Sequence, residues 1–304
     1  MKRMNVPPSP LIVLDRFVSE ANRDDLRSDE RRIYDRALSL RSRLSGPPRV
    51  LIAGEFSAGK STLANLLVGA DLIPTSVLAT HLPPVEFSYG KSGQAHASWW
   101  DTRVDVTFDR LDFQALSAVE PDYISLTAES PFLEKIRLAD TPGTGDPAMM
   151  VDMMQSVARH SDVLIWCTNA VQSWKESERR TWSELPERLR KHAVLLVTHM
   201  DLPAIRKGRQ RVLDRLNRLA GDDFAQIIPF SAPDAALAIS EGNVRDEEMW
   251  NSSGGGPLVD QVNKLAVAAR QDANELAGRL IQNYIAPSLS LNSPNDLYVG
   301  KTNP

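Results

Sequence analysis

Residues 54–61, GEFSAGKS, match the pattern GxxxxGK(S/T) at every fixed position. They follow the apolar run VLIA at 50–53 and precede the residues TLANLL, and strand–loop–helix is the context that this pattern requires. In such a loop, backbone N–H groups converge on phosphate oxygens, and the N-terminus of the helix adds partial positive charge. We expect Lys60 to neutralise the β- and γ-phosphates, Ser61 to bind Mg²⁺ and Thr62 to reach the α-phosphate. The loop therefore predicts a nucleotide hydrolase.

Three further motifs each follow an apolar run, in an order that supports this prediction. In LADTPGTG, Asp140 is expected to reach Mg²⁺ through water, and the amide of Gly143 to sense the γ-phosphate. In VLLVTHMDL, Asp201 lies where a carboxylate can accept two hydrogen bonds from guanine N1 and N2, which adenine cannot supply. In IIPFSA, the backbone of Ser231 and Ala232 is expected to approach guanine O6. Together the four motifs predict a guanine nucleotide site.

Short apolar runs separated by helix-like stretches must carry these motifs. The predicted strands are 50–53, 83–89, 136–140, 163–167, 193–198 and 226–232. This alternation predicts an α/β fold, a P-loop GTPase domain with a mostly parallel sheet covered by helices. The segment HASWWDTRVDVTF alternates and predicts a further antiparallel strand or hairpin.

Helical periodicity flanks this region on both sides. Residues 10–45 are predicted to be helical, with Ser28 starting either a second helix or a kink. GGGP at 254–257 predicts a flexible break before one long amphipathic helix. The apolar repeat of that helix consists of Val262, Ala266, Ala269, Ala273, Leu276, Leu280 and Tyr284. The predicted organisation is an N-terminal helical segment at 1–45, the GTPase domain at 46–250, a C-terminal helix at 257–285 and a flexible tail at 286–304.

The alanines of this repeat form a seam that is suited to close packing against another helix.

Composition limits the remaining choices. The chain has 304 residues, 42% hydrophobic and 24% charged, which is typical of a globular protein with one large core. A net charge of −4 gives no overall reason to expect nucleic acid as a partner. A lone cysteine, Cys167, cannot form an internal disulfide and is predicted to be a buried core residue, so we expect a reducing, cytoplasmic location. No apolar stretch approaches the length of a membrane span, so any membrane contact is expected to be peripheral, at the inner face.

The order GEFSAGKS, DTPG, THMD and FSA resembles the guanine-nucleotide-binding domain of GTPases, and more closely that of the dynamin superfamily. Among its members, the bacterial dynamin-like proteins have a similar phosphate loop, first switch (LIPTSVLATHLPPVEFSYG) and second-switch strand (AESPFLEKIRLADTPG). TNAVQSWKESERRTW resembles the segment before their guanine motif. The resemblance covers about residues 45–235. It implies a compact dynamin-like protein without a full stalk, which binds GTP with Mg²⁺, hydrolyses it to GDP and dimerises across the nucleotide. It also implies that the two flanking helical segments pack together as a short bundle, in which we expect Leu40 and Leu44 to face Ala266, Ala269 and Ala273.

The resemblance also assigns roles by position. Thr80 corresponds to the switch threonine that closes on Mg²⁺ and the γ-phosphate, with Thr75 as the competing candidate, and Ser57 occupies a position that can help to hold a monovalent cation. Lys60, Ser57 and Thr80 are thus the expected catalytic residues, and Ser61, Thr80 and Asp140 the expected metal ligands. The expected nucleotide contacts are Gly54, Glu55, Phe56, Ser57, Ala58, Gly59, Lys60, Ser61, Thr62, Gly143, Thr198, His199, Asp201, Ser231 and Ala232.

Two departures from the family pattern affect the expected activity. His199 replaces the lysine of the guanine motif (N/T)KxD, so it either stacks on the base, giving weaker and pH-dependent affinity, or merely fills the space. Phe56 and Thr144 stand where related enzymes carry a glutamine that helps to orient water. This predicts slow basal hydrolysis that rises on self-association. The alternative is a nucleotide-gated scaffold that barely hydrolyses GTP and docks a partner.

The remaining expectations concern partners. Without a stalk, the chain is expected to form a homodimer through its GTPase face or to pair with another dynamin-like chain. The segment 205–219 has six basic residues and one acid, which suits anionic lipid or RNA, although a solvated helix face is the favoured interpretation. An RNA-linked GTPase rests on this segment alone, and nucleic acid is not an expected partner.

Overall fold

The computed structural model describes residues 9–21, 26–70, 83–91, 95–100, 106–108, 115–116, 118–141, 147–240 and 243–288. The chain divides into two compact units. One consists of Pro47–Ala269, and the other of Met1–Gly46 together with Arg270–Pro304.

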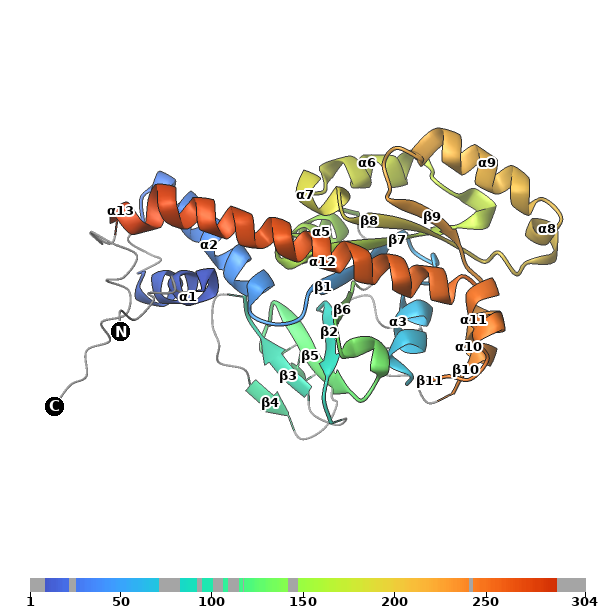
Figure 1. The fold of residues 1–304 in the computed structure, drawn as a ribbon, viewed down its shortest axis with the longest axis horizontal. Helices are drawn as coiled ribbons and strands as arrows, with labels where there is room; N and C mark the ends of the chain where they lie inside the picture. The colour runs from blue at the N-terminus through green and yellow to red at the C-terminus, as the bar shows by residue number, and fades with distance from the viewer. Residues whose placement is uncertain are drawn as a thin grey trace, which may run out of the picture. The chain divides into compact units, whose positions relative to one another are not determined.

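A mostly parallel sheet forms the centre of the larger unit (Figure 1). Its strand β1 (Arg49–Gly54) lies between β6 (Arg137–Asp140) and β7 (Val163–Asn169), and it is parallel to both. Beyond β7, the strands β8 (Ala193–Thr198) and β9 (Gln226–Pro229) continue the parallel arrangement. All six residues of β1 and of β8 are buried, which explains their apolar runs at 50–53 and 193–197. The predicted α/β fold is thus confirmed.

The other edge of this sheet contains antiparallel pairs. β2 (Val85–Tyr89) is antiparallel to β6 and parallel to β5 (Tyr123–Ala128). β3 (Ala95–Ser98) is antiparallel to β5 and to β4 (Val106–Phe108), so the predicted antiparallel hairpin is present. Within the described ranges the strand order is β4-β3-β5-β2-β6-β1-β7-β8-β9. β5 was not predicted, because its buried residues only alternate with partly exposed ones over a short segment.

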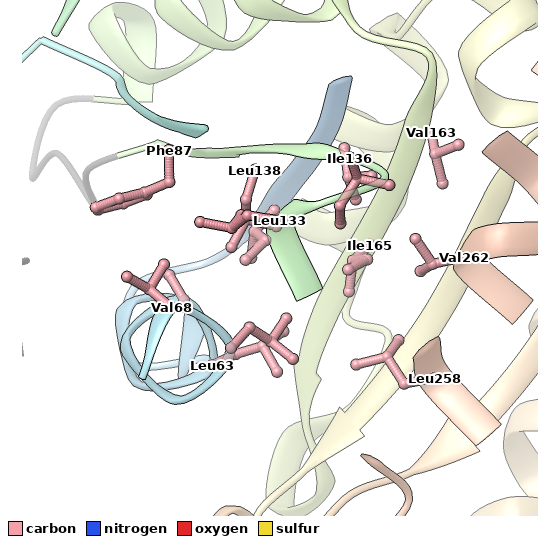
Figure 2. Close-up of a cluster of buried hydrophobic side chains, with 14 of the residues drawn as sticks. Leu63, Val68, Phe87, Leu133, Ile136, Leu138, Val163, Ile165, Leu258 and Val262 are labelled. Carbon is pink, nitrogen blue, oxygen red and sulfur yellow. The ribbon is translucent and has the colours of Figure 1, made fainter. Parts of the chain in front are cut away.

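Helices cover both faces of the sheet. One core contains Val50 and Ile52 of β1 with residues of α3 (Lys60–Val68), α10 (Ala232–Ala238) and the first part of α12 (Gly255–Leu280), and Figure 2 shows its centre. The opposite core contains Leu51 and Ala53 with residues of α5 (Pro147–His160), α6 (Glu176–Glu184), α7 (Glu187–Arg190) and α9 (Arg209–Ala220). The remaining elements of this unit are η3 (Pro131–Leu133), η4 (Ala170–Gln172), α8 (Pro203–Arg206), β10 (Ile239–Ser240), β11 (Asn243–Val244) and α11 (Glu247–Ser252).

The GGGP segment is not a flexible break, so that prediction is wrong. Gly254 has φ +94°, and a Cβ atom there would lie 2.2 Å from the carbonyl oxygen of Pro229. A Cβ atom on Gly255 would lie 2.4 Å from the ring of Trp250. The glycines therefore allow close packing, and α12 begins at Gly255, before Pro257.

In the smaller unit, α1 (Pro10–Glu20) and α2 (Ser28–Leu44) share a hydrophobic core with the end of α12 and with η5 (Ile281–Ile285), which α13 (Ala286–Ser288) follows. Of the two predicted alternatives at Ser28, the structure shows the start of a second helix. The carboxylate of Glu30 accepts the backbone N–H of Arg27 at 3.0 Å, which caps this helix.

The apolar repeat of α12 is divided between the two units. Leu40 and Leu44 share a core with Ala273, as expected, but Ala266 and Ala269 belong to the core of the larger unit. The expected repeat is wrong at two further positions, because Leu276 is 41% exposed and Tyr284 is 50% exposed. Ala277, which the repeat omitted, is fully buried in place of Leu276.

Candidate functional site

The loop at 54–59 connects β1 to α3 in a conformation that depends on residues with positive φ. Gly54 has φ +143°, Ser57 +58° and Gly59 +80°. A Cβ atom on Gly54 would lie 2.2 Å from the carbonyl oxygen of Cys167, so the loop can leave the sheet beside β7 only with glycine there. Gly59 caps α3 in the left-handed region. These angles bend the backbone around the N-terminus of a helix, where anions are stabilised.

Lys60 is the first residue of α3 and is 6% exposed. Its Nζ donates hydrogen bonds to the backbone carbonyls of Gly54 at 2.9 Å and Glu55 at 2.8 Å. Burial lowers the pKa of the ammonium group, and the nearby carboxylate of Asp140 partly opposes that shift. The side chain therefore crosses the loop and holds it in the curved form, with its charge at the loop.

Ser61 and Asp140 are 79 positions apart in the sequence and are in contact in the structure. The Ser61 hydroxyl donates to Oδ2 of Asp140 at 2.9 Å. Asp140 is 2% exposed, and burial raises the pKa of its carboxyl to about 6, although Lys60 and Ser61 act to lower it. Its Oδ1 is buried and has no hydrogen-bond partner among the described residues.

This pair of oxygen-bearing residues fits a magnesium ion. Hydroxyl, carboxylate and phosphate oxygens with water are the ligands that Mg²⁺ takes, and it is usually bound through one or two protein groups. The unpaired Oδ1 of Asp140 supplies an oxygen that a cation or its water would satisfy. Over the described ranges no group of three or more His, Cys, Asp or Glu residues is placed to hold a metal ion.

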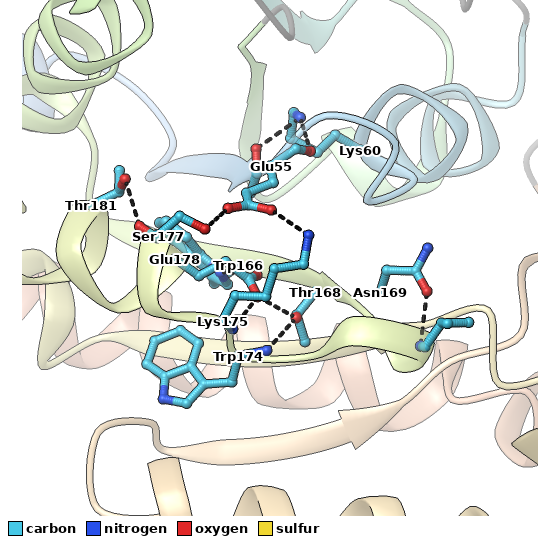
Figure 3. Close-up of polar contacts among 12 residues, drawn as sticks. Glu55, Lys60, Trp166, Thr168, Asn169, Trp174, Lys175, Ser177, Glu178 and Thr181 are labelled. Carbon is cyan, nitrogen blue, oxygen red and sulfur yellow. Dashed lines mark hydrogen bonds and ion pairs between the residues drawn. The ribbon is translucent and has the colours of Figure 1, made fainter. Parts of the chain in front are cut away.

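Glu55 makes contacts that the sequence did not reveal. Oε2 of its carboxylate lies 3.1 Å from Nζ of Lys175, and Oε1 accepts a hydrogen bond from the hydroxyl of Ser177 (Figure 3). Both partners lie at the N-terminus of α6. Some 120 residues separate them from Glu55, so no local pattern could predict the contact.

A buried carboxylate anchors that end of α6 to the sheet. Glu178 is 2% exposed and accepts hydrogen bonds from the indole of Trp166 at 3.1 Å, the hydroxyl of Thr168 at 3.0 Å and the backbone N–H of Lys175 at 2.9 Å. In the last contact Glu178, the third residue of α6, caps the backbone N–H of the N-cap residue Lys175, which is one half of a capping box. Burial raises the pKa of Glu178, although these hydrogen bonds act to lower it. The spacing from 175 to 178 is the signal that could have indicated this cap.

The last residue of β8 and the residue that follows it contact the same loop. The Thr198 hydroxyl lies 3.0 Å from the carbonyl oxygen of Ala58 and 3.2 Å from that of Thr168. Nε2 of His199 lies 3.4 Å from the carbonyl oxygen of Ser57, and His199 itself has φ +58°. The expected nucleotide contacts at 198 and 199 are therefore beside the loop.

The proposed base-recognition residues lie at the ends of β8 and β9, which are neighbours. The backbone N–H of Met200 donates to the carbonyl of Phe230 at 3.2 Å, so the segments that carry Asp201 and Ser231 are held together. The Ser231 hydroxyl donates to Oδ2 of Asp234 at 2.7 Å and lies at the start of α10, whose first residue is Ala232.

Some expected residues stand apart from this cluster. Phe56 points into solvent, with 61% of its surface exposed, and Thr62 is exposed on α3. Thr75, Thr80, Gly143 and Thr144 lie outside the described residues. Cys167 is fully buried, as predicted, and burial raises the pKa of its thiol to about 12.

The chain is similar to several known proteins. A family model described as the dynamin family matches residues 50–200. Dynamin-like protein 2 from Campylobacter jejuni is 26% identical over 260 residues, covering 83% of this chain and 39% of its own length. Isoniazid-induced protein IniC from Mycobacterium tuberculosis is 34% identical over 113 residues, covering 35% of this chain and 23% of its own.

A solved structure has the same fold at low identity. It is an oligomerised bacterial dynamin pair, described as a mechanism for the long-range sensing and tethering of membranes. The TM-score is 0.55 at 18% identity, and the match covers 98% of this chain and 59% of that chain. This chain thus spans less than two thirds of the length of each of these proteins. Among the residues that the structure describes, no helix has the length and apolarity to cross a membrane.

Proposed function

Because this chain belongs to the dynamin superfamily of GTPases, we propose that it binds GTP in the loop at 54–61 and hydrolyses it to GDP with Mg²⁺. The observation that carries this proposal is the junction of β1 and α3, where Lys60 crosses the loop and the Ser61 hydroxyl lies 2.9 Å from Asp140. Backbone N–H groups of residues 58–62 and the Lys60 ammonium would hold the phosphates. Ser61 and Asp140 would hold the metal directly and through water, with Thr80 as the further ligand. When bound, Mg²⁺ neutralises charge that develops on the phosphates.

Selection of guanine is assigned to the ends of β8 and β9. Asp201 would accept hydrogen bonds from guanine N1 and N2, and the backbone at Ser231 and Ala232 would meet O6. Thr198 supports this edge through its contact with the carbonyl of Ala58. Nε2 of His199 lies 3.4 Å from the loop carbonyl of Ser57, and we assign its ring a stacking role on the base. Ser57 itself is the proposed site of a monovalent cation.

We expect slow hydrolysis that accelerates when two GTPase faces meet. Phe56 is 61% exposed, and its side chain has no polar atom with which to orient the attacking water. Backbone groups, a switch threonine or residues from a second chain would have to supply that function. The second chain is either another copy of this protein or a different dynamin-like protein. The proposed location is the cytoplasm, with peripheral membrane contact.

Phosphate release from GTP at several protein concentrations tests this proposal. Specific activity, meaning turnover per chain, should rise with concentration in the presence of Mg²⁺, and Lys60→Ala should abolish it. The control is Lys264→Ala on α12, which leaves the loop intact. Rapid turnover that is independent of concentration would contradict the need for a second chain.

A nucleotide-gated scaffold is the second candidate function. The exposure of Phe56 favours it, because an apolar side chain at the edge of the site can contact a partner but cannot activate water. In that case GTP and GDP would bind with measurable affinity, while phosphate release would stay at the background rate at every protein concentration.

A further inference from the structure

The carboxylate of Glu55 bends away from Lys60 toward the N-terminus of α6 (Figure 3). Nζ of Lys175 lies 3.1 Å from its Oε2, and the Ser177 hydroxyl donates to its Oε1. We refer to Glu55, Lys175 and Ser177 as the loop clasp. The N-terminus of a helix attracts a nearby anion, so the carboxylate of Glu55 lies beside three features of α6 that bind negative charge: Lys175, the Ser177 hydroxyl and the helix N-terminus.

The clasp is attached to a fixed support. Glu178 accepts the backbone N–H of Lys175 at 2.9 Å, and the same buried carboxylate binds the side chains of Trp166 and Thr168 on β7. The N-terminus of α6 is therefore held against the strand next to β1. A loop residue that binds this end of α6 is held in place relative to the sheet.

The same residue shapes the loop from inside. The backbone carbonyl of Glu55 accepts a hydrogen bond from Nζ of Lys60 at 2.8 Å. Glu55 thus links Lys60, through its main chain, to Lys175, through its side chain. Its charge matters as well, because an unpaired carboxylate in this loop would repel phosphates, and the repulsion grows with the charge of the ligand.

We propose that Lys175 is a positioning residue for a nucleoside triphosphate. It holds the Glu55 side chain against α6 and neutralises the carboxylate charge, and Ser177 provides the second contact to Glu55. This inference rests on the proposed GTP site. Side chains of Lys175 and Glu55 are 43% and 26% exposed, so solvent screens the pair and the effect is moderate.

Calorimetric titration of the full chain with a non-hydrolysable GTP analogue and with GDP, both with Mg²⁺, tests the inference. Lys175→Met should weaken binding of the analogue by roughly two- to fivefold. Binding of GDP, which carries less charge, should weaken by a smaller factor, and both losses should shrink at high salt. The double variant Glu55→Gln/Lys175→Met removes the unpaired carboxylate as well, so it should recover most of the lost affinity. If Lys175 only supported the structure of the loop, the double variant would bind as weakly as Lys175→Met.

Arg179→Met is the matched control, because Arg179 pairs with Glu176 on the same helix and does not touch the loop. Melting temperatures of all variants show that they fold. If the unmodified chain binds the analogue but Lys175→Met binds it equally well, the inference fails while the proposed function stands. It also fails if Arg179→Met loses as much affinity, or if the double variant binds no better than Lys175→Met. Failure of the unmodified chain to bind either nucleotide overturns the proposed function, and the inference with it.

Discussion

Glu86 is a buried carboxylate whose partners are two arginines. It is 5% exposed, its Oε2 accepts a hydrogen bond from Nε of Arg49, and its Oε1 lies 3.6 Å from Arg137. Arg49 also lies over the ring of Trp100, at 4.8 Å from the centroid. Burial alone would raise the pKa of Glu86, but the two arginines outweigh it and lower that pKa.

Glu86→Gln should therefore lower the free energy of unfolding by about 3–5 kcal/mol, because it removes the carboxylate that pairs with two largely buried guanidinium groups. Chemical denaturation measures this difference, with Glu20→Gln, an exposed partner of Arg16, as the control. Because the pKa of Glu86 is lower in the folded state, the loss of unfolding free energy should be complete above the unfolded-state pKa of about 4.3. The loss should shrink as the pH falls through the folded-state pKa. A difference below 1 kcal/mol at neutral pH would contradict this assignment.

At the scale of elements, substitution of two glycines in or next to α12 should have opposite effects on stability. Gly254→Ala should destabilise the chain by about 2 kcal/mol or more, since φ is +94° and the new Cβ atom would lie 2.2 Å from the Pro229 carbonyl. Gly278→Ala, within α12, has no heavy atom within 4 Å of the new Cβ and should stabilise by about 0.5–1 kcal/mol. Thermal melting of both variants checks this, and equal shifts in the same direction would disprove it.

The sequence predicted best the elements that have one clear pattern, such as a continuous apolar run. The runs at 50–53 and 193–198 are buried on both faces, so they are apolar throughout and easily recognised as strands. β5 carries polar residues at alternate positions and was missed. The glycines at 254–256 were misassigned, because glycine marks both loose turns and close packing, and only the neighbours Pro229 and Trp250 decide which applies.

The candidate site also contains features that the sequence predicted and features that it did not. The phosphate loop and the meeting of Ser61 with Asp140 follow from motif spacing and parallel strand order. The contact between Glu55 and Lys175 joins residues 120 apart on neighbouring segments, and nothing local encodes it. Exposed Leu276 and buried Ala277 show how a repeat of threes and fours can shift by one position.

At the scale of the whole molecule, α12 contributes to the cores of both units. Leu258, Val262 and Ala269 are in the core of the larger unit, whereas Ala273 and Ala277 are in that of the smaller one. Burial of a large aliphatic side chain is worth about 1.5–3 kcal/mol, a large share of a stability of about 5–15 kcal/mol.

Deletion of residues 257–304 should consequently cause aggregation or loss of cooperative unfolding in the larger unit. Deletion of residues 270–304 keeps Leu258, Val262 and Ala269, and should preserve more of that unit's protection from limited proteolysis. Unchanged solubility and melting after the longer deletion would contradict the assigned role of α12.

The central claim is that the loop at 54–61 holds the phosphates of a guanine nucleotide. Calorimetric titration of the purified chain with GTP and GDP in the presence of Mg²⁺, with ATP as a competitor, tests it most directly. The account predicts binding of both guanine nucleotides, no competition by ATP, loss of binding in Lys60→Ala and loss of guanine preference in Asp201→Ala. Absence of heat with GTP and GDP, or equal competition by ATP, would contradict it.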